Sequence, residues 1–579
     1  MPTKLIEVAL PLDDINKEAA REKSIRHGHP STLHLWWARW PLAACRAVLF
    51  AQLVDDPSAH PDEFPSLKAQ EDERERLFDI IRELVKWDNS NNDRVIEAAQ
   101  AEIRRCYPDG PPAIVDPFCG GGSIPLEAQR LGLVAHASDL NPVSVMINKA
   151  LLEYPPMFAG HPPVHPKDQG KLKGTQGWSG AQGLAEDVRW YGEWMHAEAE
   201  RRIGASYPRA TLPSGSSSSV IAWLWARTVT CPNPACGSTM PLVRSFWLGK
   251  KKGKEAWIVA HPDPANKRVT FDIGRGPGGP SVEGTVLRTG ATCLVCDGPV
   301  PLEYIREAGR AGRMGAQLMA MVADGDRSRV YLAPTPEHEA AGTLSRPDTA
   351  PDSALPEQAL GFRVQAYGMT HHADLFTNRQ LTALCTLSDL VMEAHEKVLE
   401  DSGGDHKYAS AVATYLAFVV DKLTDTNSSL CSWQIDPPRL RSTFGRQALP
   451  MIWDYAEASP FGGAAGDFSV SLKSEVEVLE RLGVGTPALV SQADAAARSF
   501  ASLVVSTDPP YYDNIGYADL SDYMYVWLRR SIRDLYPELL ATVLTPKVDE
   551  LIATPYRFDG SKTRAEAHFE QGFSRVFTH

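Results

Sequence analysis

The feature that most constrains the fold is a short apolar run, 113–115, that leads into the turn Asp116-Pro117-Phe118-Cys119-Gly120-Gly121-Gly122-Ser123. A helix is expected from about Ile124, so the pattern is strand, glycine-rich turn and helix. Glycines allow the backbone to approach a bound nucleotide-like ligand closely. A second strand, about 134–138, ends at Asp139, about twenty residues after the turn, which is the spacing of a ribose ligand in a nucleotide-binding βαβ unit. The alternatives are a plain glycine turn and a helix cap at Asp139 to Pro142.

A second motif lies far downstream, where Leu503-Val504-Val505 precedes Asp508-Pro509-Pro510-Tyr511. The apolar run predicts a parallel strand, and open α/β sheets place ligand chemistry at the carboxyl ends of such strands. The Asp508 carboxylate and the Pro509 carbonyl can accept both N–H bonds of a planar amino group, while the Tyr511 ring covers its face. Proline helps because its φ is fixed and it has no N–H to compete. A structural Pro-Pro turn is the alternative for this tetrapeptide alone.

Together these motifs resemble those of S-adenosylmethionine-dependent DNA methyltransferases that act on amino groups, with 116–123 as the cofactor motif and 508–511 as the catalytic motif. More closely, the chain resembles the adenine-specific DNA methylases that carry an inserted zinc ribbon and begin with the domain of unknown function 1156. The matching stretches are His27-Gly28-His29-Pro30 through Trp36-Trp37-Ala38-Arg39 with Phe50, and then 374–381, 444–450 and 508–527.

The resemblance implies that S-adenosyl-L-methionine is the methyl donor and that the acceptor is the amino group of an adenine flipped out of double-stranded DNA. Restriction-modification or phage defence is the expected setting. The segment 34–41 would close over the methionine end of the cofactor, although its aromatic residues could equally be core packing. The implied cofactor residues are Asp116, Phe118, Gly120, Gly121, Gly122, Ser123, Asp139, Asn141 and Asp494, and the implied catalytic residues are Asp508, Pro509, Pro510 and Tyr511.

Other functions remain open from the residues alone. The same amino-group geometry would serve the cytosine amino group or an RNA base. A different class of function is an inactive DNA-binding subunit of a split methyltransferase complex.

Four of the nine cysteines form two closely spaced pairs, Cys231 with Cys236 and Cys293 with Cys296. Thiolates paired in this way can complete a tetrahedral zinc site when the intervening chain folds back as a β-ribbon. Strand-like composition at 246–247, 256–259 and 268–271 fits such a ribbon. We therefore expect a structural Zn²⁺ at these four residues; unrelated free cysteines are the alternative.

A net charge of −13 argues against a generally basic surface, so any DNA contact must come from local patches. No apolar stretch approaches the roughly 20 residues of a membrane-spanning helix, and no amino-terminal leader is recognisable, which predicts a cytoplasmic protein without a membrane partner. The candidate basic patches, for which a solvated surface is the alternative, are 250–252 with Lys254, Lys267-Arg268, and Arg439 with Arg441 and Arg446.

These anchors predict an α/β fold whose Rossmann-like methyltransferase sheet is interrupted by a large α+β insertion with a zinc ribbon. Strands are expected to end at Val115, Ala137, Val490 and Val505. A methyltransferase sheet of this class normally has further strands, so we expect it to be incomplete at the C-terminus: the enzyme is split, the chain is truncated, or another polypeptide supplies the remaining edge. The predicted divisions are an N-terminal helical domain (1–110), the cofactor-binding part of the core (111–154), an insertion with the zinc ribbon (155–332), a linker (333–360), a helical part of the insertion (361–470), and the second part of the core with the catalytic motif (471–579).

Helices are expected within several of these divisions. The patterns place them at about 33–53, 71–86, 377–399, 407–425 and 565–577.

Overall fold

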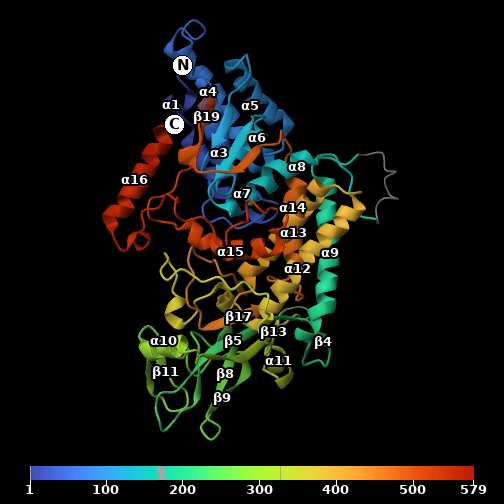
Figure 1. Ribbon diagram of the computed structural model, residues 1–579, viewed down its shortest axis with the longest axis vertical. Coiled ribbons are helices and arrows are strands. Elements are labelled where there is room, and N and C mark those ends of the chain that lie inside the picture. The colour runs from blue at the N-terminus through green and yellow to red at the C-terminus, as the bar shows by residue number, and fades with distance from the viewer. Residues whose placement is uncertain (1, 167–176, 326–327, 579) are drawn as a thin grey trace.

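The computed structural model describes residues 2–166, 177–325 and 328–578. The molecule is elongated, with a parallel sheet and the N-terminal helices at one end, long helices in the middle, and antiparallel sheets at the other end (Figure 1). Within the described residues, no helix combines the length and the apolar character needed to cross a membrane.

The parallel sheet has four strands in the order β18-β2-β1-β19. Val115 in β1 lies opposite His136 in β2 and Val505 in β19. The four strands lie where the sequence predicts them, so a mixed α/β fold with a parallel sheet is confirmed. Because all four run in one direction, their carboxyl ends meet at a single edge. The bounds are β1 Ala113–Asp116, β2 Ala135–Asp139, β18 Leu489–Gln492 and β19 Leu503–Val505.

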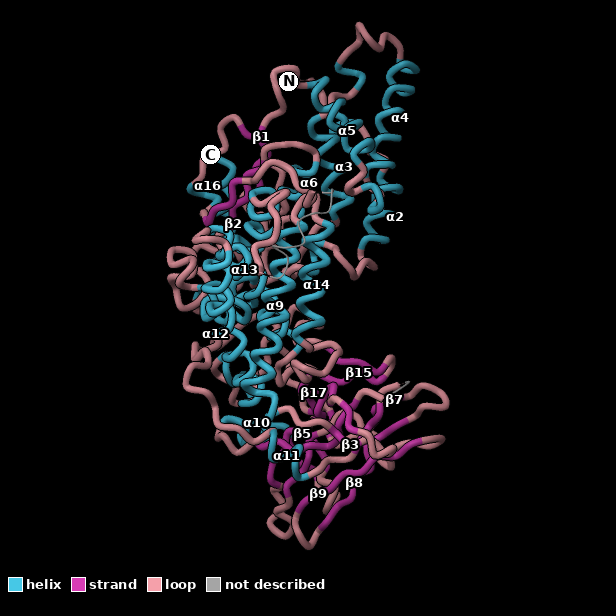
Figure 2. Tube along the Cα trace, turned by 90° about the vertical axis from the view of Figure 1, so that its right-hand side faces the viewer, coloured by secondary structure: helices cyan, strands magenta, loops and turns pink. Residues whose placement is uncertain are grey.

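The N-terminal helices lie to one side of this sheet (Figure 2). Helix α3 (Leu42–Leu53) packs against α6 (Ser123–Arg130), and an Arg46–Glu127 ion pair of 2.8 Å joins them with both side chains fully buried. Breaking such a pair on one side costs about 3–5 kcal/mol. The prediction of a helix from residue 33 is wrong, because α3 begins only after Pro41, whose ring disfavours continuation from the preceding turn. The other N-terminal helices are α1 Leu5–Val8, α2 Leu12–Glu22, α4 Leu67–Leu84 and α5 Asp93–Cys106.

Long helices connect the two ends of the molecule. Helix α13 (His406–Thr426) is central, with contacts to α9, α12, α14 and α15, and it buries Tyr415, Phe418 and Val419. One continuous apolar core extends from Leu5 to Leu540 and includes these helices and the sheet. Helices α12 and α13 were predicted at these positions. The remaining helices here are α7 Pro142–Asn148, α8 Tyr154–Met157, α9 Gln182–Ile203, α12 Asn378–Asp401, α14 Phe468–Arg481 and α15 Tyr517–Ile532.

The far end contains several antiparallel sheets around β5 (Val220–Thr230). Strand β17 (Asp454–Ala458) pairs with β5, and the buried ion pair Arg379–Glu457, 2.7 Å long, ties α12 to β17. The two predicted parts of the insertion therefore share one sheet. The other strands are β3 Ala210–Thr211, β4 Ser217–Ser218, β6 Thr239–Leu242, β7 Trp247–Gly249, β8 Ala256–Asp263, β9 Arg268–Arg275, β10 Val286–Leu287, β11 Gly290–Thr292, β12 Pro299–Pro301, β13 Gly315–Ala323, β14 Val330–Leu332, β15 Ser432–Ile435 and β16 Pro438–Arg441.

Three further helices lie at the edges of the molecule. Helix α11 (Pro336–Ala341) falls in the segment predicted as a linker, and α10 (Leu302–Arg310) borders the antiparallel sheets. Helix α16 (Lys562–Thr578) lies where a helix was predicted, and its Phe573 ring contacts Phe118, with 6.0 Å between the ring centroids. Helix α16 thus packs against a residue of the glycine-rich turn.

Candidate functional site

A pocket opens at the carboxyl ends of the parallel strands. It contains about 940 Å³ of empty space, which includes open solvent at its mouth. Segments that are far apart in the sequence form its wall. They are 36 and 38–40, 116–121 with 123–124, 139–141, 493–495, 508–510, 517–518, 546 and 549–551.

Nearly all of the predicted site residues line this one pocket. The residues brought together are Asp116, Phe118, Gly120, Gly121, Ser123, Asp139, Asn141, Asp494, Asp508, Pro509 and Pro510. Gly122 does not line it; this left-handed residue caps the start of α6 and packs beside Asn148. Tyr511 lies next to the pocket, at the surface, with 39% of its area exposed.

The glycine turn is covered by the loop that precedes α3. A Cβ atom on Gly120, whose φ is +46°, would lie 2.6 Å from Trp36 Nε1, and one on Gly121 would lie 2.8 Å from Arg39 Nε. Arg39 donates from Nη1 to the Gly121 carbonyl at 2.9 Å and from Nη2 to the His34 carbonyl at 2.8 Å. Because these glycines have no side chains, the turn leaves space for this loop as well as for a ligand. Trp36 in turn stacks on Tyr517, with ring centroids 5.5 Å apart and planes 4° from parallel.

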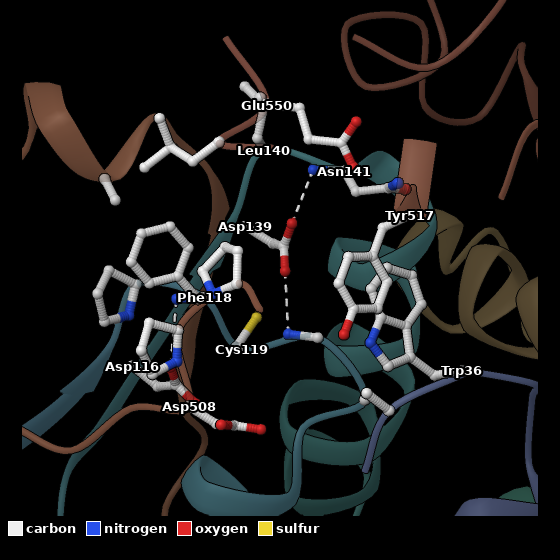
Figure 3. Close-up of a pocket in the computed structure, with 18 of the residues that line it drawn as sticks. Trp36, Asp116, Phe118, Cys119, Asp139, Leu140, Asn141, Asp508, Tyr517 and Glu550 are labelled. Carbon is white, nitrogen blue, oxygen red and sulfur yellow. Dashed lines mark hydrogen bonds between the residues drawn. The ribbon is translucent and has the colours of Figure 1, made fainter. Parts of the chain in front are cut away.

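Asp139 faces the pocket and also holds the turn in place (Figure 3). One carboxylate oxygen accepts the Gly120 N–H and the Ser144 hydroxyl, both at 2.9 Å, and the other accepts the Asn141 N–H at 2.9 Å. Burial raises the pKa of Asp139, and these hydrogen bonds act in the opposite direction. Asp139 is therefore an anchor for the backbone around the pocket.

The pocket is lined by acidic side chains. Burial raises the pKa of Asp116 to about 7, although its carboxylate accepts hydrogen bonds from the Thr507 hydroxyl at 2.6 Å and the Phe118 N–H at 3.2 Å. Arg39 is the one Lys, Arg or His side chain among the described lining residues, and it is bound to two carbonyls. This environment favours a cationic ligand and disfavours phosphates. The lining carboxyl groups are Asp116, Asp139, Asp494, Asp508, Asp549 and Glu550.

Asp508 lies at the mouth of the pocket, where the Tyr511 hydroxyl donates a hydrogen bond to its carboxylate. Burial raises the pKa of Asp508, while its hydrogen bonds with Tyr511 and Trp40 lower it. Tyr511 and Trp40 are each more than a third exposed, so two aromatic rings flank this carboxylate at the surface. Together they form a place where a flat, hydrogen-bonding group could be held.

Two parts of the wall were not predicted from the sequence. Glu550 belongs to the loop after α15 and accepts the Ala518 N–H at 2.9 Å, which holds this loop against the pocket. No local pattern marks this loop. Tyr517 lies within 508–527, one of the stretches on which the family resemblance rests. That resemblance was the sequence signal that could have identified it.

The four paired cysteines come together at the far end of the molecule, and their sulfur atoms all lie within 4.8 Å of one another. The Sγ–Sγ distances are 3.8 Å for Cys231–Cys296 and 3.9 Å for Cys236–Cys293. Sulfurs at the corners of a tetrahedron with Zn–S bonds of about 2.3 Å are about 3.8 Å apart, so the arrangement fits zinc. The cluster could therefore hold a metal ion such as zinc.

Comparison with known proteins matches only the N-terminal part of the chain. No curated protein and no solved structure matches. The matched stretch contains α2, α3 and the loop whose Trp36 and Arg39 line the pocket. Residues 9–80 match a family described as a protein of unknown function, DUF1156.

Proposed function

We propose that the chain is an S-adenosylmethionine-dependent methyltransferase that acts on the exocyclic amino group of adenine in DNA. The supporting observation is that one acidic pocket combines the glycine turn after β1, the acid after β2 and Asp508-Pro509-Pro510 after β19. The sulfonium and ammonium groups of S-adenosylmethionine outweigh its carboxylate, so the cofactor is a net cation and suits this lining. A dinucleotide would instead bring a pyrophosphate close to several carboxylates, which is electrostatically unfavourable.

The residues divide into a cofactor part and an acceptor part. In this proposal the glycine turn, Asp139 and Asn141 bind one end of the cofactor, and Asp494 binds near its adenine. When bound, the cofactor supplies an electrophilic methyl group. Asp508 and the Pro509 carbonyl accept the two N–H bonds of the target amino group and so orient its nitrogen lone pair. Tyr511 and Trp40 provide faces on which the flipped base stacks, as aromatic residues do for unpaired bases.

The parallel sheet is then the Rossmann-like core of the methyltransferase. Strand β19 is an edge strand among the described residues, and Val505 in it is 41% exposed. Natural proteins normally pair or cover such edges. We propose that a second polypeptide pairs with β19 and supports activity, and that the cysteine cluster holds a structural zinc ion.

The test separates cofactor binding from methyl transfer. Asp508→Ala should reduce tritiated-methyl incorporation into DNA by about a thousandfold or more, because the acceptor nitrogen is no longer oriented. Calorimetry should show that affinity for S-adenosylmethionine changes by less than about twofold, since Asp508 is at the acceptor end. Asp513→Ala is the matched control, because Asp513 is an exposed acid close by in the chain that does not line the pocket.

Two results would contradict the proposal. Failure of the unaltered chain to bind S-adenosylmethionine would remove the cofactor assignment. Equal incorporation by the unaltered chain and Asp508→Ala, with or without coexpressed partner, would remove the catalytic assignment.

A further inference from the structure

Two of the three basic patches lie side by side in the fold. Strand β15 packs against β7, and Trp433 Nε1 donates to the Leu248 carbonyl at 3.0 Å (Figure 2). A Cβ atom on Gly249 would lie 3.4 Å from Pro438 Cγ, so the start of the β7–β8 loop is in contact with β16. The lysines of that loop therefore lie beside Arg439 and Arg441 of the β15–β16 hairpin, and Arg446 of the segment after β16 extends the same surface. We call it the basic face, and its residues are Lys250, Lys251, Lys252, Lys254, Arg439, Arg441 and Arg446.

The third patch, Lys267-Arg268, is separate. In the β8–β9 hairpin, Asp263 pairs with Arg268 at one end, and Ala256 pairs with Arg275 at the end next to the β7–β8 loop. A strand of this length separates the two ends by roughly 24 Å. Arg268 also has an acidic neighbour in Asp263 at 3.8 Å. Lys267-Arg268 therefore lies outside the basic face and offers a matched control.

The basic face carries uncompensated charge in a chain whose net charge is −13. All seven of its side chains are exposed. Among the described residues, the one ion pair recorded for them joins Lys250 to Glu283 at 3.8 Å. Arg439 donates to the Gln434 side chain instead, at 3.0 Å. Such a patch suits a polyanion, because neutralising phosphates releases condensed counterions.

The basic face continues to the wall of the pocket. Phe444 packs edge-on against Trp37, with ring centroids 5.3 Å apart, and Gln447 donates to the Trp37 carbonyl at 3.0 Å. Arg446 lies between these two contacts in the sequence and is exposed. Trp36, the neighbour of Trp37, lines the pocket. A ligand that follows the arginines therefore arrives beside the pocket.

We propose that the basic face binds the phosphate backbone of a DNA duplex and guides it to the pocket, with Arg446 at the end nearest the pocket wall. The choice of DNA as the polyanion rests on the proposed function. The position of the face rests on the contacts alone. Backbone contacts of this kind carry no sequence information, so the effect should be the same for every duplex sequence.

The experiment compares Arg441→Gln/Arg446→Gln with Lys267→Gln/Arg268→Gln, which removes the same charge at the far end of the β8–β9 hairpin. Binding of a fluorescent DNA duplex is followed by anisotropy over a series of salt concentrations, without cofactor. We expect the first variant to bind about tenfold or more weakly and its log–log salt slope to decrease by about two, because each lost phosphate contact contributes about 0.9. The second should stay within about twofold of the unaltered chain.

Equal weakening in both variants, or an unchanged salt slope in the first, would overturn the proposal. Tighter binding of an RNA duplex of the same sequence would assign the face to RNA and overturn it as well. Titration of the unaltered chain with S-adenosylmethionine separates this proposal from the function: salt-dependent duplex binding that the first variant weakens, without any cofactor binding, would refute the methyltransferase and leave the basic face intact. Normal cofactor binding with no salt-dependent duplex binding would refute the basic face and leave the methyltransferase proposal intact.

Discussion

The acidic pocket and the cysteine cluster lie at opposite ends of the molecule and are built in opposite ways. In the pocket, the protein itself satisfies the polar groups: Asp139 accepts three hydrogen bonds, and Asp116 accepts two. In the cluster, four sulfur atoms lie mainly against one another. We therefore expect the pocket to be stable without a ligand, whereas the cluster should need a bound ion.

The largest expected effect is the loss of the metal. If the proposed zinc ion is bound, Cys293→Ser should release it and loosen β5, β6, β11 and β12, because structural zinc binding contributes on the order of 10 kcal/mol to small folds of this kind. Strand β17 should loosen with them, because it pairs with β5. Elemental analysis should find about one equivalent of zinc in the unaltered chain and less than about half an equivalent in the variant. Hydrogen exchange measures the loosening as a loss of amide protection in these strands.

Cys106→Ser is the control for this experiment, because Cys106 lies in α5, outside the cluster. Affinity for S-adenosylmethionine should be unchanged in both variants. Full protection of β5 in a zinc-free chain would break the comparison, since the cluster would then be stable without an ion.

An intermediate effect is expected from Asp139→Ala. The change leaves the Gly120 and Asn141 N–H groups without their acceptor, which should reduce the free energy of unfolding by about 2–4 kcal/mol and abolish most cofactor binding. Thermal unfolding and calorimetry measure the two effects. Asp494→Ala is a useful contrast: its carboxylate lines the same pocket but accepts from the Ala496 N–H within its own turn. Unchanged stability of Asp139→Ala would show that the turn does not need this anchor.

The smallest effect is a pH dependence at Asp116. Its pKa is raised to about 7, so the folded chain binds more protons than the unfolded chain between about pH 4 and 7, and its contribution to stability falls as pH rises through that window. A cationic ligand favours the ionised carboxylate, so cofactor affinity should rise by up to about tenfold per pH unit below 7 and then level off. Calorimetry between about pH 5.5 and 8 tests this. Asp116→Asn should flatten the profile, and a profile that instead falls with pH would contradict a cationic ligand.

Sequence patterns predicted the parts of the molecule whose structure depends on residues close together in the chain. Strands β1 and β2, whose ends were predicted at Val115 and Ala137 and lie at Asp116 and Asp139, follow from residues adjacent in the chain, as does the close spacing within each cysteine pair. The pairing of Asp454 in β17 with Ala226 in β5 joins segments more than 200 residues apart, and neither strand's composition specifies the other. The loop carrying Glu550 reaches the pocket through a backbone contact at Ala518, which its own composition does not indicate. The start of α3 after Pro41 is a boundary that a proline could have marked.

The order of the strands has a consequence for synthesis of the chain. Strand β2 ends at Asp139, and the next strand to join the sheet begins at Leu489, followed by β19 at Leu503. A ribosome adding about 5–20 residues per second needs roughly 20–70 s to cover that distance. Throughout that interval, β1 and β2 have no neighbour on their outer sides, although the helices that will surround them are already being made. The sheet is therefore completed late, and no nascent chain shorter than about 510 residues contains both walls of the pocket.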